Sequence, residues 1–172
     1  MRHLTTIISL FVVIALLGLM TISLHERGFI TPINYKQYSL VTTQKEDKLV
    51  TLLLTMGAKK ENVQKISNGI KLAEQVTGVK PKMTVAIICS ESEFNKNARS
   101  KKGYKGLMQT PVKTDYEEVD ILYGAMIFKE KLAIANGDVL KGLVLYKGGD
   151  NPEAWKEARK TMALYNKIQY EG

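Results

Sequence analysis

The residues of this chain that could do chemistry are concentrated between Glu91 and Gln109, in the stretch ESEFNKNARSKKGYKGLMQ. An apolar run, Val85 through Cys89, comes just before Glu91, and a polar turn and the segment GLMQ follow it. This order predicts an acid whose stem is buried at the end of a hydrophobic segment and whose head faces a substrate. A carboxylic acid in such a setting acts as a general acid or base.

The composition excludes most other routes to catalysis. The sequence has two histidines, His3 and His25, which lie at or outside the ends of the first apolar segment, so the body of the chain has no imidazole. Serine–histidine and cysteine–histidine hydrolases need that base, and common zinc sites use it as a ligand. Cys89 is the only cysteine and is interpreted as a small buried residue. We therefore expect no metal, no cofactor and carboxylate chemistry.

Glu91 is the best candidate for the acid. If the apolar segment is a helix that continues to Glu91, then Ile87 and Ile88 share its face. Apolar neighbours disfavour an ionised carboxylate, which suits an acid that must hold its proton. Glu93 would point away from that face, and we expect it to be exposed to solvent.

A second carboxylate is needed in most glycosidases, about 5–5.5 Å from the first for retention or about 6.5–9.5 Å for inversion. The nearest downstream acids lie in the segment TDYEEVD. This segment also reads as a solvated loop followed by a helix cap at Asp120. If one acid positions a water, the chain is a hydrolase; if none does, the substrate must assist. The four candidates are Asp115, Glu117, Glu118 and Asp120.

The first 24 residues form a separate unit. Residues 4–24 carry no charge and are long enough to cross a hydrocarbon core of about 30 Å as a helix. Arg2 precedes this segment, which favours a signal-anchor with a cytoplasmic amino terminus and an extracytoplasmic body. The alternative is a cleaved signal peptide, although LGLMTISLHERG has no small-residue cleavage site. Residues 25–44 read as a tether, and residues 45–172 as a single domain.

The body of the chain has the periodicity of helices and little strand-like alternation. The class is therefore mainly α, with a loop-rich region over 95–119 and a short hairpin near Ser100–Leu107. The segment that begins at Pro81 is apolar nearly all round, which predicts the central buried helix. Helices are expected over Lys45–Met56, Asn62–Thr77, Pro81–Cys89, Asp120–Ala135, Val139–Tyr146 and Pro152–Ile168.

The net charge of +8 suits an anionic polymer or surface. The lysines are dispersed along the chain, and no basic stripe with interleaved aromatic residues occurs. Together with the expected export of the domain, this argues against nucleic acid as a partner.

The Glu91–Gln109 stretch fills the pattern E-S-x-F-x-x-x-A-x-S-x-x-G-x-x-G-L-M-Q, which resembles the signature of the soluble lytic transglycosylases (SLT), relatives of goose-type lysozyme. Further resemblance extends over about residues 60–170. DILYGAM has Asp120 where the family usually has asparagine, LVLYKGG keeps Tyr146 but has Lys147 in place of asparagine, and ALYNKI contains Tyr165. The resemblance implies a lysozyme-like fold.

The resemblance also implies cleavage of the β-1,4 bond between N-acetylmuramic acid and N-acetylglucosamine in peptidoglycan, with a 1,6-anhydro product. This is a carbon–oxygen lyase reaction. Glu91 would act as acid and then base, assisted by the muramoyl N-acetyl group. Ser100, Met108, Gln109 and Tyr146 would line the sugar groove, and Tyr165 would hold Glu91 in position.

Three alternatives remain open. A positioned water would make the chain a goose-type lysozyme-like hydrolase, and the exchange at Lys147 could leave a catalytically weak peptidoglycan-binding module. The chain could also be a structural membrane protein. The segment Thr110–Asp120 is short for the family, which suggests a more open groove. The sequence does not choose among wall turnover, secretion-apparatus assembly and phage entry or release, so partners in the envelope stay unassigned.

Overall fold

The structure, a computed structural model, describes residues 47–170. This part of the chain is mainly α, as predicted: it has six helices, and its only β-type pairing is an isolated bridge between Arg99 and Lys105 in the expected hairpin region. The helix ends lie within a few residues of those predicted. The helices are α3 (Lys48–Thr55), α4 (Val63–Thr77), α5 (Pro81–Ser92), α6 (Glu117–Ile134), α7 (Val139–Tyr146) and α8 (Pro152–Lys167).

Local sequence signals explain where the helices begin and end. The carboxylate of Asp47 accepts a hydrogen bond from a backbone N–H in the first turn of α3, and the amide oxygen of Asn151 does the same for α8. Pro81 opens α5, where its missing N–H costs nothing. Gly78 ends α4 with a left-handed φ of 72°, a conformation that glycine adopts without strain.

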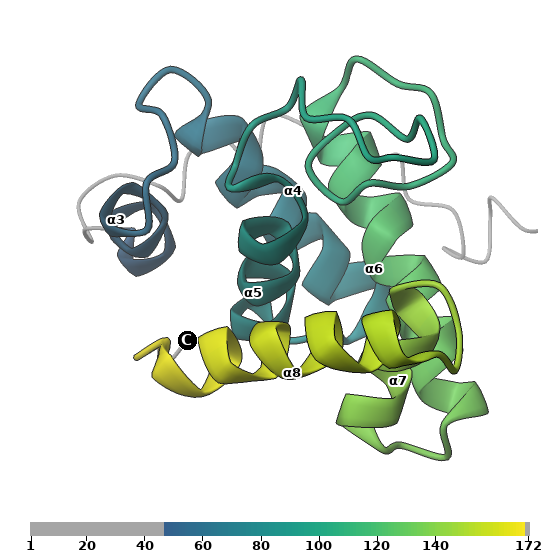
Figure 1. The fold of residues 1–172 in the computed structure, drawn as a ribbon. Helices are drawn as coiled ribbons and strands as arrows, with labels where there is room; N and C mark the ends of the chain where they lie inside the picture. The colour runs from purple at the N-terminus through teal and green to yellow at the C-terminus, as the bar shows by residue number, and fades with distance from the viewer. Residues whose placement is uncertain (1–46, 171–172) are drawn as a thin grey trace, which may run out of the picture. The chain divides into compact units, whose positions relative to one another are not determined.

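Helix α5 lies near the middle of the domain, with α8 crossing below it in the view of Figure 1. Four consecutive residues of α5, Val85 to Ile88, are fully buried. Burying one valine or isoleucine side chain stabilises a fold by about 1.5–3 kcal/mol. The helix is therefore firmly held, and its last turn presents Glu91 at a fixed place.

Helix α6 approaches its neighbours closely at glycines. A Cβ added at Gly69 of α4 would lie 2.9 Å from Cδ1 of Ile121, and one at Gly142 of α7 would lie 3.2 Å from Cα of Leu132. These contacts fix both ends of α6 against α4 and α7. The start of α6 and the end of α7 supply residues to the candidate site, so the glycines position them.

The start of α6 differs from the prediction. The helix begins at Glu117 with Tyr116 as its N-cap residue, so Asp120 is not a helix cap. Asp120 lies in the first turn and is 4% exposed, and Glu117 is 5% exposed. The segment TDYEEVD is thus only partly a solvated loop, because the two acids pack inward against partners of opposite polarity.

The predicted membrane anchor over residues 1–24 and the tether over residues 25–44 lie outside the described residues. Within residues 47–170, no helix combines the length and the apolar character needed to cross a bilayer.

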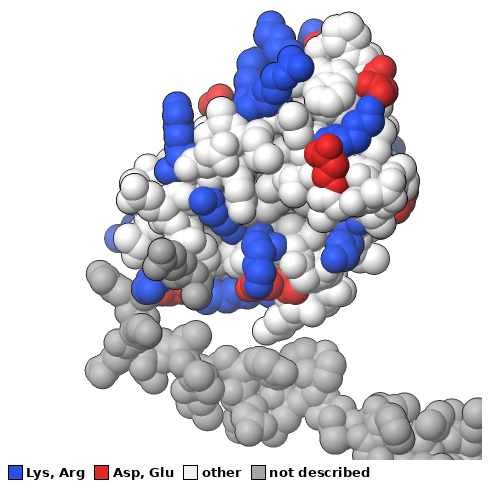
Figure 2. Space-filling view, turned by 90° about the horizontal axis from the view of Figure 1, so that it is seen from below, with Lys and Arg blue, Asp and Glu red and all other residues white. Residues whose placement is uncertain are grey.

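Basic side chains are scattered over the face drawn in Figure 2 and do not form one stripe. This agrees with the dispersed lysines of the sequence.

Candidate active site

Glu91 is the penultimate residue of α5, and its side chain is 17% exposed. The chain turns sharply just after it, because Glu93 and Phe94 both have left-handed φ values, 49° and 63°. Phe94 is buried, which holds this unusual turn in place, and Glu93 is exposed as expected. Glu91 is thus a partly covered acid at the rim of the core.

Lys147, directly after α7, contacts Glu91. Its Nζ lies 2.8 Å from Oε1 of Glu91 and donates a hydrogen bond to Oγ of Ser90 at 2.7 Å. The same Ser90 oxygen accepts a hydrogen bond from Oγ1 of Thr161 in α8 at 2.8 Å. The Lys147 side chain is only 6% exposed. The end of α5, Lys147 after α7 and Thr161 of α8 therefore meet around Ser90 and Glu91, an arrangement that the sequence did not predict.

The loop between α7 and α8, which carries Lys147, is held by Asp150. Lys141 forms an ion pair with Asp150, and Nε1 of Trp155 donates a hydrogen bond to its Oδ1 at 2.6 Å. The hydrogen bonds from Lys141 and Trp155 lower the pKa of Asp150. This exposed cluster anchors the loop to the first turn of α8.

The GLMQ loop (Gly106–Gln109) is held by the buried carboxylate of Asp120. The N–H groups of Leu107 and Met108 donate to its Oδ2 at 2.6 and 3.1 Å, and Oγ1 of Thr110 donates to its Oδ1 at 3.1 Å. Gly106 has a φ of 121°, and a Cβ there would lie 2.5 Å from Oδ2 of Asp120. Burial raises the pKa of Asp120, although its hydrogen bonds oppose the shift.

Tyr146 holds the same loop from the other side. Its hydroxyl donates a hydrogen bond of 2.7 Å to the carbonyl of Met108. Burial raises the pKa of Tyr146 well above its ordinary value, and the negative charges of Glu91 and Asp120 add to the shift. The Met108 side chain is fully buried, and a Cβ at Gly124 would lie 2.5 Å from its Cβ. In this arrangement Met108 offers a sugar only its backbone.

Gln109 and Ser100 are largely engaged within the loops. Nε2 of Gln109 donates to the carbonyls of Ala98 and Gly106, at 3.0 and 2.6 Å. Oγ of Ser100 accepts from the N–H of Tyr104 at 3.1 Å and closes the turn. Oε1 of Gln109 is buried and has no hydrogen-bond partner within residues 47–170. That oxygen is an unused acceptor beside the GLMQ loop.

Tyr165 contacts a side chain from the start of α5. The ammonium of Lys82 lies 4.6 Å from the centre of its ring, and Lys82 is in the first turn of α5, whereas Glu91 is in the last. Helix α8 crosses α5, so Thr161 meets the Glu91 end and Tyr165, one turn later, reaches the opposite end. Among the described contacts, Glu91 pairs with Lys147 and the Tyr165 ring pairs with Lys82.

Two other candidate carboxylates have partners of their own. Asp115 is exposed and lies 3.1 Å from Nζ of Lys105. Glu117 is buried and pairs with Lys96 at 2.9 Å and with Lys65 at 3.9 Å. Burial opposes ionisation of Glu117, but the hydrogen bond and charge of Lys96 outweigh it and lower its pKa. Both carboxylates are therefore taken up by ion pairs.

A hollow of about 870 Å³ lies beside the GLMQ loop, between the turn that contains the Arg99–Lys105 bridge and the chain that leads into α6. Its lining is basic and aromatic, with Tyr104 and Tyr116 among the residues that face it. A basic, aromatic surface suits a sugar that carries negative groups.

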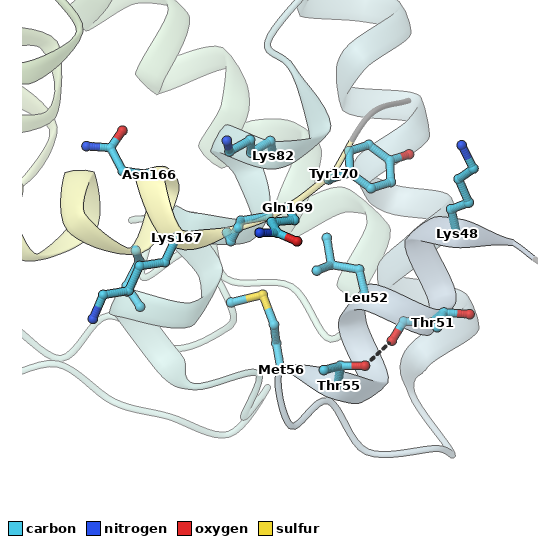
Figure 3. Close-up of a pocket in the computed structure, with 12 residues that line it drawn as sticks. Lys48, Thr51, Leu52, Thr55, Met56, Lys82, Asn166, Lys167, Gln169 and Tyr170 are labelled. Atoms are coloured by element: carbon cyan, nitrogen blue, oxygen red, sulfur yellow. Dashed lines mark hydrogen bonds between the residues drawn. The ribbon is translucent and has the colours of Figure 1, made fainter.

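A second hollow, of about 1140 Å³, lies between α3 and the end of α8. Leu52 of α3 and Met56, the residue directly after that helix, face Gln169 and Tyr170 across it (Figure 3). Glu91 lines neither hollow.

Comparison with known protein families matches residues 68–120 to the transglycosylase SLT domain. The matched range runs from α4 to Asp120 and contains the whole Glu91–Gln109 pattern, so the resemblance to that family is confirmed over these residues. Tyr146, Lys147 and Tyr165 lie outside it. No curated protein and no solved structure matches the chain. The SLT match supports a transglycosylase-type function that acts on peptidoglycan.

Proposed function

We propose that this chain, whose residues 68–120 match the SLT domain, is a lysozyme-like lytic transglycosylase that cleaves the MurNAc-β-1,4-GlcNAc bond of peptidoglycan. Glu91 is its acid–base residue. The observation that carries this assignment is the placement of Glu91: a partly exposed carboxylate at the end of the central helix. Tyr146 lies between Glu91 and the GLMQ loop. Its hydroxyl donates a hydrogen bond to the loop, and the negative charge of Glu91 helps to raise its pKa.

The proposed reaction needs one carboxyl group. Glu91 protonates the glycosidic oxygen, and the muramoyl N-acetyl group assists departure of the leaving sugar. Glu91 then accepts the proton of the C6 hydroxyl as that oxygen closes the anhydro ring. The engagement of the two buried acids, Glu117 and Asp120, supports this route over a two-carboxylate mechanism. Asp115 and Glu117 are ion-paired, and Asp120 holds the GLMQ loop.

Sugar binding is assigned to the surface around the GLMQ loop. A rotation of the Gln109 side chain would bring its buried, unpartnered Oε1 to a sugar N–H or O–H. The Met108 carbonyl, which already accepts from Tyr146, has a second lone pair for a sugar donor. Ser100 and Tyr104 would border the glycan from the neighbouring turn, where the basic hollow can accept carboxylates of the peptide stems. Tyr146 would hold the GLMQ loop in place through its hydrogen bond to the Met108 carbonyl.

We assign residues 4–24 as the membrane anchor, with the amino terminus in the cytoplasm and the domain on the periplasmic or wall side. An anchored chain would stay in the membrane pellet after alkaline carbonate extraction. A shorter mature chain that appears in the soluble fraction would favour a cleaved signal peptide.

The decisive experiment incubates the full chain with purified sacculi and identifies the products by mass spectrometry. Anhydro-muropeptides are expected, and Glu91→Gln should lower their rate of release about 100-fold or more. Glu93→Gln, two positions away and exposed, is the matched control and should keep the wild-type rate. Reducing ends would favour the lysozyme-like hydrolase, and binding to sacculi without release would favour a binding module. Unchanged activity of Glu91→Gln would remove Glu91 from the mechanism.

A further inference from the structure

The ion pair of Glu91 and Lys147 places a second proton-bearing group directly on the candidate acid. The two side chains meet at 2.8 Å and are largely covered, with exposed fractions of 17% and 6%. An ion-paired carboxylate can accept a proton but has none to give. The proposed reaction nevertheless begins with proton donation by Glu91, so the structure must supply that proton from another source.

Lys147 is suited to supply it. Of its three N–H groups, one faces Oε1 of Glu91 and one is bound by Oγ of Ser90, which fixes the ammonium in place. Lysine, unlike arginine, gives up its proton readily when it is desolvated. Removal of water from an ion pair penalises both charges and favours the neutral forms of both partners.

We propose that Lys147 stores the proton that Glu91 donates. When a glycan covers the pair and displaces water, a proton passes from Nζ of Lys147 to Oε1 of Glu91 and leaves an amine beside a carboxylic acid. Lys147 does not touch the sugar and acts through Glu91, so it is a positioning residue. This inference rests on the proposed function, because the acid step belongs to it.

The protons and electrons balance over one turnover. The carboxylic acid gives its proton to the glycosidic oxygen as the bond from C1 to that oxygen breaks, and the bonding pair stays on the oxygen, which becomes the 4-hydroxyl of N-acetylglucosamine. The oxygen of the assisting N-acetyl group bonds to C1 as the leaving sugar departs, and the C6 oxygen then bonds to C1 as that bond breaks and its electron pair returns to the N-acetyl oxygen. The proton of the C6 hydroxyl goes to the carboxylate of Glu91 and from there to the amine of Lys147. The pair ends as it began, an ammonium beside a carboxylate.

Charged and titratable groups of every neighbouring element surround the pair. Tyr146 stays neutral because its pKa is raised by burial and by the charges of Glu91 and Asp120. The pKa of Glu157 on α8 is lowered, first by its hydrogen bond with Lys160 and in smaller part by the charge of Lys147. The neighbouring groups are Tyr146 at the end of α7, Asp120 on α6, which shifts the pKa of Tyr146 together with Glu91, Glu157 on α8, and Lys102, whose Nζ would lie 3.2 Å from a Cβ at Gly148. Glu93, directly after α5, is exposed to solvent.

Two exchanges of Lys147 separate a proton store from a simple ion pair. Lys147→Arg keeps the charge but cannot release a proton, so we expect kcat on sacculi to fall about 100-fold near neutral pH, where solvent does not protonate Glu91, with KM changed less than about threefold. Lys147→Met has neither charge nor proton. It should work in acid, where solvent protonates Glu91, and should lose about tenfold in rate per pH unit above that range. The wild type should keep its rate to higher pH.

Controls keep these results interpretable. Lys156→Met removes an exposed lysine of α8 and should leave kcat and its pH profile unchanged. The thermal unfolding of each variant shows whether it is folded. A Lys147→Arg variant with wild-type kcat near neutral pH would overturn the proposal, since an ion pair alone would then suffice.

A measurement without turnover locates the proton. In the full chain in detergent micelles, the ¹⁵N signal of the Lys147 Nζ should move from the ammonium to the amine range when a GlcNAc oligomer is added to saturation. An ammonium signal that persists in the bound state would overturn the proposal. If no variant and no wild-type sample cuts sacculi, the proposed function fails, while this signal still reports where the proton lies.

Discussion

Two single residues decide how this site departs from the pattern it resembles. Asp120 and Lys147 both stand where the resemblance leads us to expect asparagine, and the side chains of both are buried and engaged. Asp120 binds two backbone N–H groups and one hydroxyl through its two oxygens. The side-chain amide of an asparagine could make most of these hydrogen bonds without carrying a charge. The carboxylate of Asp120 therefore has a desolvation cost that asparagine would avoid.

This cost predicts a pH-dependent difference between wild type and Asp120→Asn. Because burial raises the pKa of folded Asp120 above its ordinary value of 3.8, the unfolded chain releases the proton first as pH rises. The unfolding free energy of the wild type should therefore fall relative to Asp120→Asn from about pH 4 upward, until the folded carboxyl is also ionised. Below about pH 4, where Asp120 is protonated in both the folded and the unfolded chain, this titration should add no difference between the two unfolding free energies.

Denaturant unfolding at a series of pH values measures the difference. The same exchange at the exposed Asp115 tests whether loss of any carboxylate changes the profile. A wild type that gains stability over Asp120→Asn as the pH rises would contradict the sign, and would mean that the hydrogen bonds of Asp120 outweigh its burial.

At the level of elements, helix α6 organises the site through close contacts. Its first turn holds the GLMQ loop with Asp120, and its second supports the loop with Gly124. Both contacts are too close for a larger residue, because a Cβ at Gly106 or at Gly124 would lie 2.5 Å from Asp120 or Met108 respectively. The position of the loop relative to α5 therefore depends on the surface of α6 as much as on the loop itself.

Gly124→Ala should damage both stability and activity. The new Cβ would lie 2.5 Å from Cβ of Met108, so Met108 and the GLMQ loop must move. We expect a loss of about 1–3 kcal/mol in unfolding free energy from overpacking, and a lower kcat on sacculi. Met126→Ala, on an exposed position of the same helix, is the control and should change neither. Full activity with wild-type stability in Gly124→Ala would contradict the role given to this contact.

At the scale of the whole molecule, the net charge of +8 should help the chain to reach an anionic wall. We expect the fraction bound to sacculi in a sedimentation assay to fall as sodium chloride rises from about 50 mM to about 500 mM, because salt screens exposed charges. The Glu91→Gln variant should be used so that cleavage does not release the bound protein. Binding that is independent of salt would assign recognition to uncharged sugar contacts alone.

The sequence was a good guide to helices and a poor guide to side-chain partners. Apolar periodicity, the stop at Gly78 and the start at Pro81 were sufficient to predict α4 and α5, because these signals are local. The burial of Asp120 could not be read from TDYEEVD, since a polar run looks solvated until its partners are known. Lys147 was recognised as a departure, but its contact with Glu91 depends on how α7 packs against α5.

The loop anchored by Asp150 gives the molecule a built-in optical probe. Trp155 is the only tryptophan in the sequence, and its indole N–H is bound to Asp150 in the loop that begins at Lys147. Tryptophan fluorescence from the unmodified protein, excited where tyrosine does not absorb, therefore originates next to the candidate site and nowhere else. A shift in that emission on addition of glycan fragments would allow affinity to be titrated without a label, even in variants that cut nothing.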